Sequence, residues 1–349
     1  MESIRIHKGS AKNVLIFKEP TKDSFGKGAF EFLDYFSIFD WGRFLNDPIK
    51  KKGIAMVAIA RKHFELLKEA GIKTHYEGIT GPTKINVALV NTPEPYKNVA
   101  AGLKNYLLPI EIIFRIYTHP ESSDLKKIKE GKRTYQELGY KEMPEPNKKL
   151  PHVKISYSTK LEAQDRVLAK EEARILAGLV EQEMNRLEEL ALEVNEIITN
   201  HCERVGMIHY DGKIEVAKDT NGDFMVVDVL GTLDEDRFMM NINGDKYIDV
   251  SKQFIRNWFV VNGWKKIVDE AKKRAEKEKV KDWTTFCNEP PKLPEKISKL
   301  VTEMYLADAE ARTEERLGER LGIEVRPLKE VAREIYEIQE AHRAGVRDF

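Results

Sequence analysis

The sequence predicts an α+β protein with two lobes built on antiparallel sheets and a helical C-terminal region. Short apolar and aromatic runs separated by turns fill the first 40 residues. Two long segments have apolar residues at helical spacing, and a turn centred on Asn221-Gly222 joins two alternating runs. The order strands, helix, strands, helix, hairpin, helices is typical of α+β proteins.

The first lobe is predicted to begin with two strands, VLIF at 14–17 and AFEFL at 29–33. The GKG segment at 26–28 is interpreted as the hairpin connection between them. Apolar residues then recur at helical spacing over 53–70, and a glycine follows, so a helix is expected there. INVALV at 85–90 is a further strand candidate.

The second lobe is expected to contain one long buried strand and one long helix. The run LPIEIIFRIY at 108–117 is rich in isoleucine, which favours a buried strand. Lysine, glutamate and proline dominate 119–154, which indicates surface loops and a short helix. Apolar residues face one side of a helix predicted over 170–205. Beyond Ser251 the chain is highly charged and predicted to be mostly helical, with an interruption at 288–294.

The predicted hairpin at 207–231 has the residues best suited to chemistry. Residues two apart on a strand point to the same face, so Asp211, Lys213 and Glu215 are expected side by side. Asp228 lies in an apolar run, where an isolated carboxylate is costly to bury without a cation. Such carboxylates with a lysine suit magnesium and nucleotide phosphates. The same alternation also fits an ordinary solvated strand face.

Two other segments are candidates for anion binding. Gly9-Ser10-Ala11-Lys12 joins two strand-like runs, so its backbone N–H groups and Lys12 are placed to hold phosphates; an ordinary hairpin turn has the same pattern. Glu111 and Arg115 share a face of the strand at 108–117. They are interpreted either as a structural ion pair or as an anion clamp with its orienting acid.

Composition narrows the classes of function. The chain has 58 basic and 58 acidic side chains among 349 residues, so nothing favours a nucleic-acid or membrane-surface partner. Charged residues make up 33%, which fits the ion-pair-rich surface of a thermophile protein. Cys202 and Cys287 are too few for a disulfide framework or a multi-cysteine zinc site. With no long apolar run and no signal-peptide pattern, a cytoplasmic location is expected.

Motifs for other chemistry are missing from the sequence. The eight histidines show no His-x-x-x-His spacing, and His201-Cys202 falls on the amphipathic helix, where structural roles are expected. There is no Gly-x-Ser-x-Gly elbow, Walker-type loop or dinucleotide fingerprint. Covalent serine or cysteine catalysis therefore has no support.

Taken in order, several segments resemble the SAICAR synthetase family, ATP-dependent ligases of purine biosynthesis. They are GSAK (9–12), FDWG (39–42), KKG (51–53), LLKEAGIKTHY (66–76), LPIEIIFR (108–115), the hairpin and following segment (209–238), SKQFIRNW (251–258) and ISKLVTEMYLADAE (297–310). The resemblance implies a two-lobed ATP-binding fold of the ATP-grasp or kinase-like kind. It also implies that the chain joins a carboxylated aminoimidazole ribonucleotide to L-aspartate through an acyl phosphate, with ATP and Mg²⁺.

The resemblance implies a role for individual residues of this chain. Nucleotide contacts would come from Gly9, Ser10, Lys12, Lys104, Lys160, Asp211, Glu215 and Asp228. Lys213, Glu111, Arg115 and Arg237 would act on the reacting groups or bind the ribonucleotide. Glu215 and Asp228 would hold the metal. Asp165, in YSTKLEAQD, resembles part of the family's Lys-Asn/Asp-Asp segment.

The chain departs from the family mainly at the second-substrate end of the expected site. A small-residue loop after the substrate arginine is replaced by 116–123, and the Ser-Ser before Arg237 is replaced by Glu235-Asp236. Each new carboxylate is expected to repel a phosphate by roughly 1 kcal/mol or more. Ser10 replaces the first lysine of the phosphate loop, and Val229 replaces a glutamate.

These departures leave several interpretations open. SAICAR synthetase activity is the first. The alternatives are a paralogue with a different acid or amine, a non-catalytic protein that binds ATP or a purine nucleotide, and a small-molecule kinase. The predicted regions are a nucleotide-binding lobe at 1–107, a substrate and Mg-ATP lobe at 108–258, and a helical region at 259–349. The last region is interpreted as a solvated helical pair, as a cap on the site or as the contact of a homo-oligomer.

Overall fold

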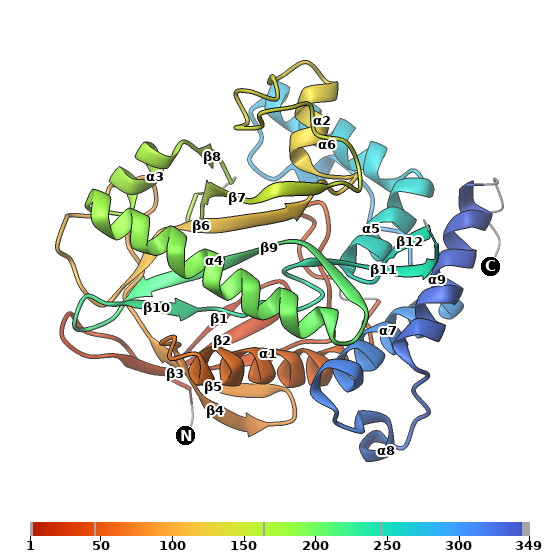
Figure 1. Ribbon diagram of the computed structural model, residues 1–349, viewed down its shortest axis with the longest axis horizontal. Coiled ribbons are helices and arrows are strands. Elements are labelled where there is room, and N and C mark those ends of the chain that lie inside the picture. Colours follow the sequence, from red (N-terminus) through yellow and green to blue (C-terminus); the bar gives the residue numbers. More distant parts are fainter. Residues whose placement is uncertain (1–2, 45–46, 163–164, 245, 344–349) are drawn as a thin grey trace.

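A computed structural model describes residues 3–44, 47–162, 165–244 and 246–343, which form two antiparallel sheets covered by helices (Figure 1). The first sheet has the strand order β1-β2-β3-β5-β4. Its strands are β1 (Arg5–Lys8), β2 (Lys12–Lys18), β3 (Gly26–Phe32), β4 (Tyr76–Gly81) and β5 (Lys84–Leu89). The α+β prediction is therefore confirmed.

The second sheet has the order β12-β11-β9-β6-β7-β8. Strand β11 pairs with the first half of β9, and β10 pairs with the last residues of β9, from Glu215 to Lys218. Its strands are β6 (Tyr106–Tyr117), β7 (Lys149–Thr159), β8 (Val167–Leu168), β9 (Met207–Lys218), β10 (Phe224–Val227), β11 (Arg237–Asn243) and β12 (Lys246–Asp249). The predicted strand at 108–117 and the predicted hairpin are thus present as β6 and as β9 with β10. Strands β4, β7, β8, β11 and β12 were not predicted, and β7 begins within the segment 119–154, where surface loops and a short helix were expected.

Helices cover the sheets and complete the C-terminal region. They are α1 (Lys52–Glu69), α2 (Ser123–Lys129), α3 (Lys170–Leu176), α4 (Glu181–Glu203), α5 (Lys252–Val261), α6 (Trp264–Glu278), the 3₁₀ turn η1 (Trp283–Phe286), α7 (Glu295–Thr313), α8 (Leu317–Leu321) and α9 (Leu328–Arg343). In Figure 1, α4 crosses the second sheet, and α1 lies beside the first. The helix predicted at 53–70 corresponds to α1, and the region after Ser251 is helical as expected.

The single helix predicted over 170–205 is wrong, because the chain breaks between α3 and α4. Gly178 adopts φ 64°, a left-handed conformation that ends α3. A Cβ atom at this position would lie 2.6 Å from the carbonyl oxygen of Val99. The break therefore follows from a contact with a segment nearly 80 residues away.

The interpretation of residues 26–28 as a hairpin connection is also wrong. Gly26 is the first residue of β3, and Gly28 pairs with Ile16 on one side and Val87 on the other. A Cβ atom on Gly28 would lie 2.8 Å from the oxygen of Leu15. Glycine is needed here because neighbouring groups approach the strand closely.

The two sheets are joined by backbone hydrogen bonds and by a shared core. The N–H of Val226 in β10 donates to the oxygen of Lys73 (2.9 Å), and the N–H of His75 donates back to the oxygen of Val226 (3.1 Å). The N–H of Ala88 in β5 donates to the oxygen of His75 (2.8 Å), so the segment 73–75 bridges both sheets. One apolar cluster includes Phe64 of α1, Phe114 of β6 and Met304 of α7, all fully buried.

Among the described residues, no helix is long and apolar enough to cross a membrane.

Candidate active site

A cleft of about 1550 Å³ is lined by residues from both sheets, from the segment 228–237 and from α5 and α6. Strand β6 gives the cleft a direction, because Leu107 lies near its start and Arg115 near its end. Along the neighbouring β9, Glu215 is opposite Glu111 and Asp211 is opposite Arg115. The cleft therefore runs from an apolar end, past Glu215, to an end rich in arginine.

The apolar end is suited to a flat, uncharged ring. It is lined by Val14, Ile16, Phe30, Leu89, Leu107 and Val227. These side chains come from the first sheet, from the start of β6 and from the end of β10.

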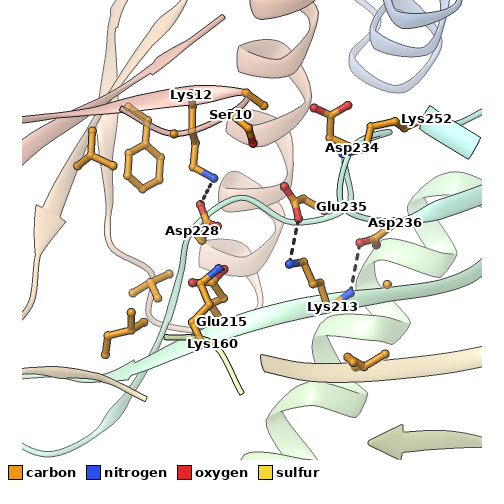
Figure 2. A pocket seen from close by; sticks show the side chains of 18 of the residues that line it. Ser10, Lys12, Lys160, Lys213, Glu215, Asp228, Asp234, Glu235, Asp236 and Lys252 are labelled. Atoms are coloured by element: carbon orange, nitrogen blue, oxygen red, sulfur yellow. Dashed lines mark hydrogen bonds and ion pairs between the residues drawn. The ribbon is translucent and has the colours of Figure 1, made fainter. Parts of the chain in front are cut away.

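The middle of the cleft brings together carboxylates and lysines, as the sequence predicted (Figure 2). Asp211, Lys213 and Glu215 all line the cleft, with Asp211 towards its arginine-rich end, so the three residues do share a face of β9. Asp228 also lines it, but it lies just past β10 and not within a strand, with φ 60°. This left-handed conformation turns its carboxylate towards Lys12, with Nζ 2.5 Å from Oδ1.

Glu215 and Asp228 form a hydrogen-bonded carboxylate pair. Burial and the nearby charge of Asp228 raise the pKa of Glu215 far above its ordinary value. Burial also opposes ionisation of Asp228, but Lys12 and Lys160 outweigh it and lower its pKa. The directions of these two shifts favour one proton held between the two carboxylates.

This carboxylate pair fits a divalent cation. Two carboxylates in contact repel each other when both are ionised, and hard oxygen ligands are those that Mg²⁺ prefers. A cation between them would take the place of the shared proton. No cluster of three or more His, Cys, Asp or Glu residues suited to a metal occurs in the described part of the chain, so any further ligands would come from phosphate oxygens and water.

Three lysines surround the pair. Lys160 lies 2.5 Å from Glu215 and Lys213 lies 2.6 Å from Glu111, each distance measured from Nζ to Oε1. Burial lowers the pKa of each lysine, but neighbouring carboxylates outweigh it and raise the pKa, as they do for Lys12. All three lysines are therefore positively charged and placed to neutralise phosphates.

Glu111 orients two of these lysines from below the cleft. Glu111 itself does not line the cleft. It accepts hydrogen bonds from Lys213 (2.6 Å), Lys160 (3.3 Å) and the hydroxyl of Ser158 (3.2 Å). Burial opposes ionisation of Glu111, but Lys213 and Lys160 lower its pKa. The expected pairing of Glu111 with Arg115 is wrong: the Arg115 guanidinium lies 3.3 Å from Asp124.

Arg237 is held by the protein's own acceptors. Its Nε donates to Asp211 Oδ1 (2.7 Å), and a second nitrogen pairs with the other oxygen of Asp211. Its third nitrogen donates to the backbone oxygen of Glu121 (3.4 Å). Asp211 therefore orients Arg237 at the arginine-rich end and lies away from the Glu215–Asp228 pair.

Two cations at this end were missed by the sequence reasoning. Lys252 and Arg256 line the cleft from α5, and neither has a carboxylate within 4.0 Å among the described residues. Arg256 donates to the side-chain oxygen of Gln253 (3.4 Å). Burial lowers the pKa of both groups. The signal was their spacing of four residues in SKQFIRNW, which places both on one face of a helix.

The predicted phosphate loop is a hairpin turn that also lines the cleft. The N–H of Gly9 donates to the oxygen of Lys12 (3.0 Å) and closes the turn between β1 and β2. Gly9, Ser10 and Lys12 all line the cleft. The structure is thus compatible with both interpretations of residues 9–12, an ordinary hairpin turn and a phosphate-binding loop.

Lys104 and Asp165 lie outside the cleft lining. Lys104 is exposed and packs against Gly222 in the turn of the β9–β10 hairpin, so its placement gives no support for nucleotide contact. Burial and the charge of Glu111 raise the pKa of Asp165. Residues 163–164 of the YSTKLEAQD segment lie outside the described residues.

The two carboxylates that replace Ser-Ser differ in their surroundings. Asp236 is fully buried beneath Gly212, and its carboxylate lies 3.0 Å from Nε2 of His209. Glu235 faces the cleft, where Lys213 lies 3.7 Å away (Figure 2). Asp236 also lines the cleft, but its side chain is fully buried against His209, so Glu235 is the one of these two carboxylates that a ligand can contact directly.

The altered loop at 116–123 is fixed by a buried histidine. Nδ1 of His119 accepts from the backbone N–H of Glu121 (3.0 Å), so Nε2 carries the proton and donates to Asp249 (2.8 Å). This arrangement places the backbone oxygen of Glu121 against Arg237.

Comparisons with known proteins agree with this architecture. The SAICAR synthetase family model matches residues 5–271. A relative from Archaeoglobus fulgidus, provisionally named phosphoribosylaminoimidazole-succinocarboxamide synthase, is 34% identical over 349 residues, which cover 95% of this chain and 100% of the relative. The synthase of that name from Thermoplasma acidophilum is 29% identical, with coverage of 83% and 95%.

Solved structures agree as well. A SAICAR synthetase (type 2) in complex with ADP is 25% identical, with a TM-score of 0.54 over 72% of this chain and 90% of that chain. The SAICAR synthase of Saccharomyces cerevisiae, complexed with SAICAR, shares the fold at 19% identity, with a TM-score of 0.65 over 89% of this chain and 95% of that one.

The fold and the cleft define an enzyme, a ligase that forms a C–N bond. The chain belongs to the SAICAR synthetase family, and the resemblance inferred from the sequence is confirmed.

Proposed function

We propose that this enzyme uses ATP to join a carboxylic acid to an amine through an acyl phosphate. The observation that carries the proposal is the order of groups along the cleft. An apolar end is followed by the Glu215–Asp228 pair with its three lysines. Then comes an end with the cations Lys252 and Arg256, which have no carboxylate partner within the described ranges. This order matches a nucleoside triphosphate with its ring at the apolar end and its phosphate chain at the carboxylate pair. A second anion would lie beyond the phosphate chain.

In the first step, the enzyme holds two anions together. A carboxylate oxygen of the acid attacks the γ-phosphorus, the bond from that phosphorus to the β–γ bridging oxygen breaks, and ADP leaves. Like charges would keep the acid and the triphosphate apart in water. Lys12, Lys160 and Lys213 offset this repulsion in a cleft that fixes their position in advance.

In the second step, the amine nitrogen attacks the acyl carbon. The bond from that carbon to the phosphate-bearing oxygen breaks, phosphate leaves, and the departing phosphate takes up the proton that the nitrogen loses. Lys213 lies between the carboxylate pair and the arginine-rich end along β9, so its ammonium group is placed to stabilise the departing phosphate.

Mg²⁺ would be held by Glu215 and Asp228, whose shared proton marks a place for a cation. When bound, it would neutralise charge on the phosphate chain and orient it.

The first substrate pair to test is carboxyaminoimidazole ribonucleotide with L-aspartate, because relatives carry the name of the corresponding synthase. Lys252 and Arg256 are placed to bind the sugar phosphate or a carboxylate. Glu235 in the cleft favours the alternative of a different acid or amine.

The test is the formation of ADP and amide from ATP, this acid and this amine. Lys213→Ala is expected to lower kcat by roughly 100-fold or more, as removal of a preorganised charge-stabilising group usually does. The matched control is Lys132→Ala, which removes an exposed lysine paired with Glu130 on the surface and is expected to keep full activity. A phosphorylated product formed without any amine would instead indicate a small-molecule kinase. Nucleotide binding with no turnover across a panel of acids and amines would indicate a binding protein.

A further inference from the structure

A buried histidine–aspartate pair, His119 and Asp249, lies behind the arginine-rich end of the cleft. His119 is 1% exposed and Asp249 is 6% exposed, and Nε2 of the histidine donates to Oδ1 of the aspartate (2.8 Å). Neither side chain lines the cleft. The pair joins the loop between β6 and α2 to the end of β12. Its hydrogen bonds continue on both sides towards arginines that do line the cleft.

On the loop side, His119 holds the backbone that contacts Arg237. Nδ1 of the histidine accepts from the N–H of Glu121 (3.0 Å), and the oxygen of Glu121 accepts from Arg237 (3.4 Å). The backbone oxygen of His119 accepts from the N–H of Ser122 (2.9 Å), whose hydroxyl caps the start of α2. The loop is therefore held both by the histidine ring and by the end of a helix.

On the helix side, a row of two amides links Asp249 to Arg256 in α5. Nδ2 of Asn257 donates to Oδ2 of Asp249 (3.4 Å), and Nε2 of Gln253 donates to Oδ1 of Asn257 (2.9 Å). The guanidinium group of Arg256 donates to Oε1 of Gln253 (3.4 Å). A carboxylate only accepts and a guanidinium only donates, so one orientation of the two amides satisfies the whole row. Asp249 thereby fixes which atom of Gln253 faces Arg256.

The two arginines need to be held, because they carry like charges. Burial lowers the pKa of Arg256 and the nearby charge of Arg237 lowers it further, so the two guanidinium groups repel each other when no anion lies between them. We propose that the histidine–aspartate pair positions Arg237 and Arg256 relative to each other for an anionic substrate. Neither member of the pair touches that substrate; both act through the loop backbone and the two amides. Positioning in advance reduces the entropy lost when the substrate binds.

This inference rests on the proposed function, since it concerns the anion that lies beyond the phosphate chain. His119 belongs to the loop at 116–123, which departs from the family pattern. The altered loop therefore supplies one half of the pair, and the end of β12 supplies the other half.

An exchange of two side chains tests the row of amides. Asp249→Asn puts a donor opposite the donor of Asn257, so either that bond is lost or both amides turn and present a donor to Arg256. The KM for at least one of carboxyaminoimidazole ribonucleotide and L-aspartate is expected to rise about fivefold or more, while the KM for ATP changes less than about twofold. Asp249→Asn/Asn257→Asp lets the new amide donate to the new carboxylate, which still accepts from Gln253. This double variant is expected to recover most of the loss, which a general loss of stability would not do.

Replacement of the histidine gives a second readout. In His119→Asn the side-chain oxygen still accepts from the N–H of Glu121, but the bond to Asp249 is lost. This variant is expected to raise the same KM about threefold or more, and to have little further effect in the Arg256→Ala background, where the end of the row is already missing. His152→Asn, on an exposed residue of β7, is the matched control and is expected to keep the wild-type KM values.

Calorimetry of Mg-ADP binding, with affinity expected within about twofold of wild type, checks that each variant is folded. If amide forms normally but Asp249→Asn and His119→Asn leave both substrate KM values unchanged, or the double variant recovers nothing, the ligase proposal stands and this inference fails. If the wild-type enzyme forms no amide, the ligase proposal fails. Binding of ribose 5-phosphate in the presence of Mg-ADP then decides: weaker binding in both variants supports the positioning role, and no binding by the wild type or equal affinity in all three proteins would overturn it.

Discussion

The shared proton of Glu215 and Asp228 makes nucleotide binding depend on pH. In the ligand-free protein, burial and Asp228 raise the pKa of Glu215, so the pair retains a proton near neutral pH. Binding of Mg²⁺ with ADP needs both carboxylates ionised and is therefore expected to release up to one proton. Affinity should rise with pH until the raised pKa is passed and then become constant.

The free energy of unfolding of the protein without ligand should change with pH in the opposite direction to the affinity for nucleotide. A carboxyl group with a raised pKa in the folded state contributes stability at low pH that is lost as the pH rises through that raised pKa.

The proton release expected on Mg-ADP binding is measured by calorimetry of that binding in two buffers with different ionisation enthalpies. Glu215→Gln should abolish it, and an identical binding enthalpy in both buffers for the wild-type enzyme would contradict the shared proton.

A buried ion pair between Lys52 and Asp234 ties the start of α1 to the site. Lys52→Met is expected to lower the free energy of unfolding by about 3–5 kcal/mol, because it leaves the carboxylate of Asp234 buried without its cation. Burial opposes ionisation of Asp234, but Lys52 lowers its pKa, so this contribution is present above the ordinary pKa of an aspartate and is lost as the pH falls below it. Urea unfolding checks the change. Lys52→Met/Asp234→Leu should recover much of the loss, and a loss below about 1 kcal/mol in the single variant would refute this role.

At the scale of elements, Gly178 decides where one helix ends and the next begins. Gly178→Ala is expected to destabilise the protein by about 2 kcal/mol, because φ 64° strains an L-residue and the new methyl group would contact the oxygen of Val99. Gly81→Ala is the control, since its Cβ would meet nothing closer than 3.8 Å and its φ is not left-handed. Thermal unfolding compares the two, and an equal change in both would contradict the explanation.

Elements that depend on local pattern were predicted from the sequence, and those that depend on distant contacts were not. The apolar periodicity of α1, the isoleucine-rich run of β6 and the Asn-Gly turn of the hairpin are local signals. The break at Gly178 depends on Val99, and β11 exists because it pairs with β9, whose Asp211 is 26 residues before Arg237. Neither partner is visible in the local sequence.

The candidate site could be predicted in part for the same reason. The alternation of a strand placed Asp211, Lys213 and Glu215 on one face, and the structure agrees. The sequence did not indicate that Asp236 would turn away to His209, or that Asp211 would be paired with Arg237. These outcomes depend on which side chains meet across the folded sheet.

At the scale of the whole molecule, the two sheets are expected to unfold together. The segment 73–75 bonds to both sheets, and a single apolar cluster extends from the first sheet to α7. The three predicted regions, the homo-oligomer, the cytoplasmic location and the thermophilic character stay predictions.

Whole-molecule cooperativity leads to a prediction about ligand binding. Mg²⁺ with ADP at 100 times its Kd should stabilise the protein by about 2.7 kcal/mol in a single transition, because the ligand binds the folded state alone. Chemical unfolding followed by tryptophan fluorescence and by circular dichroism measures it. Two separate transitions, with ligand shifting one of them alone, would show that the sheets are independent.

We expect the acid to be activated by phosphoryl transfer before the amine attacks. This order of steps is tested most directly with an acid whose carboxylate carries ¹⁸O, incubated with ATP, the amine and the enzyme, followed by mass spectrometry of the released phosphate. The acyl-phosphate route predicts that each phosphate contains one oxygen from the acid. Phosphate free of ¹⁸O, formed alongside the amide, would contradict it.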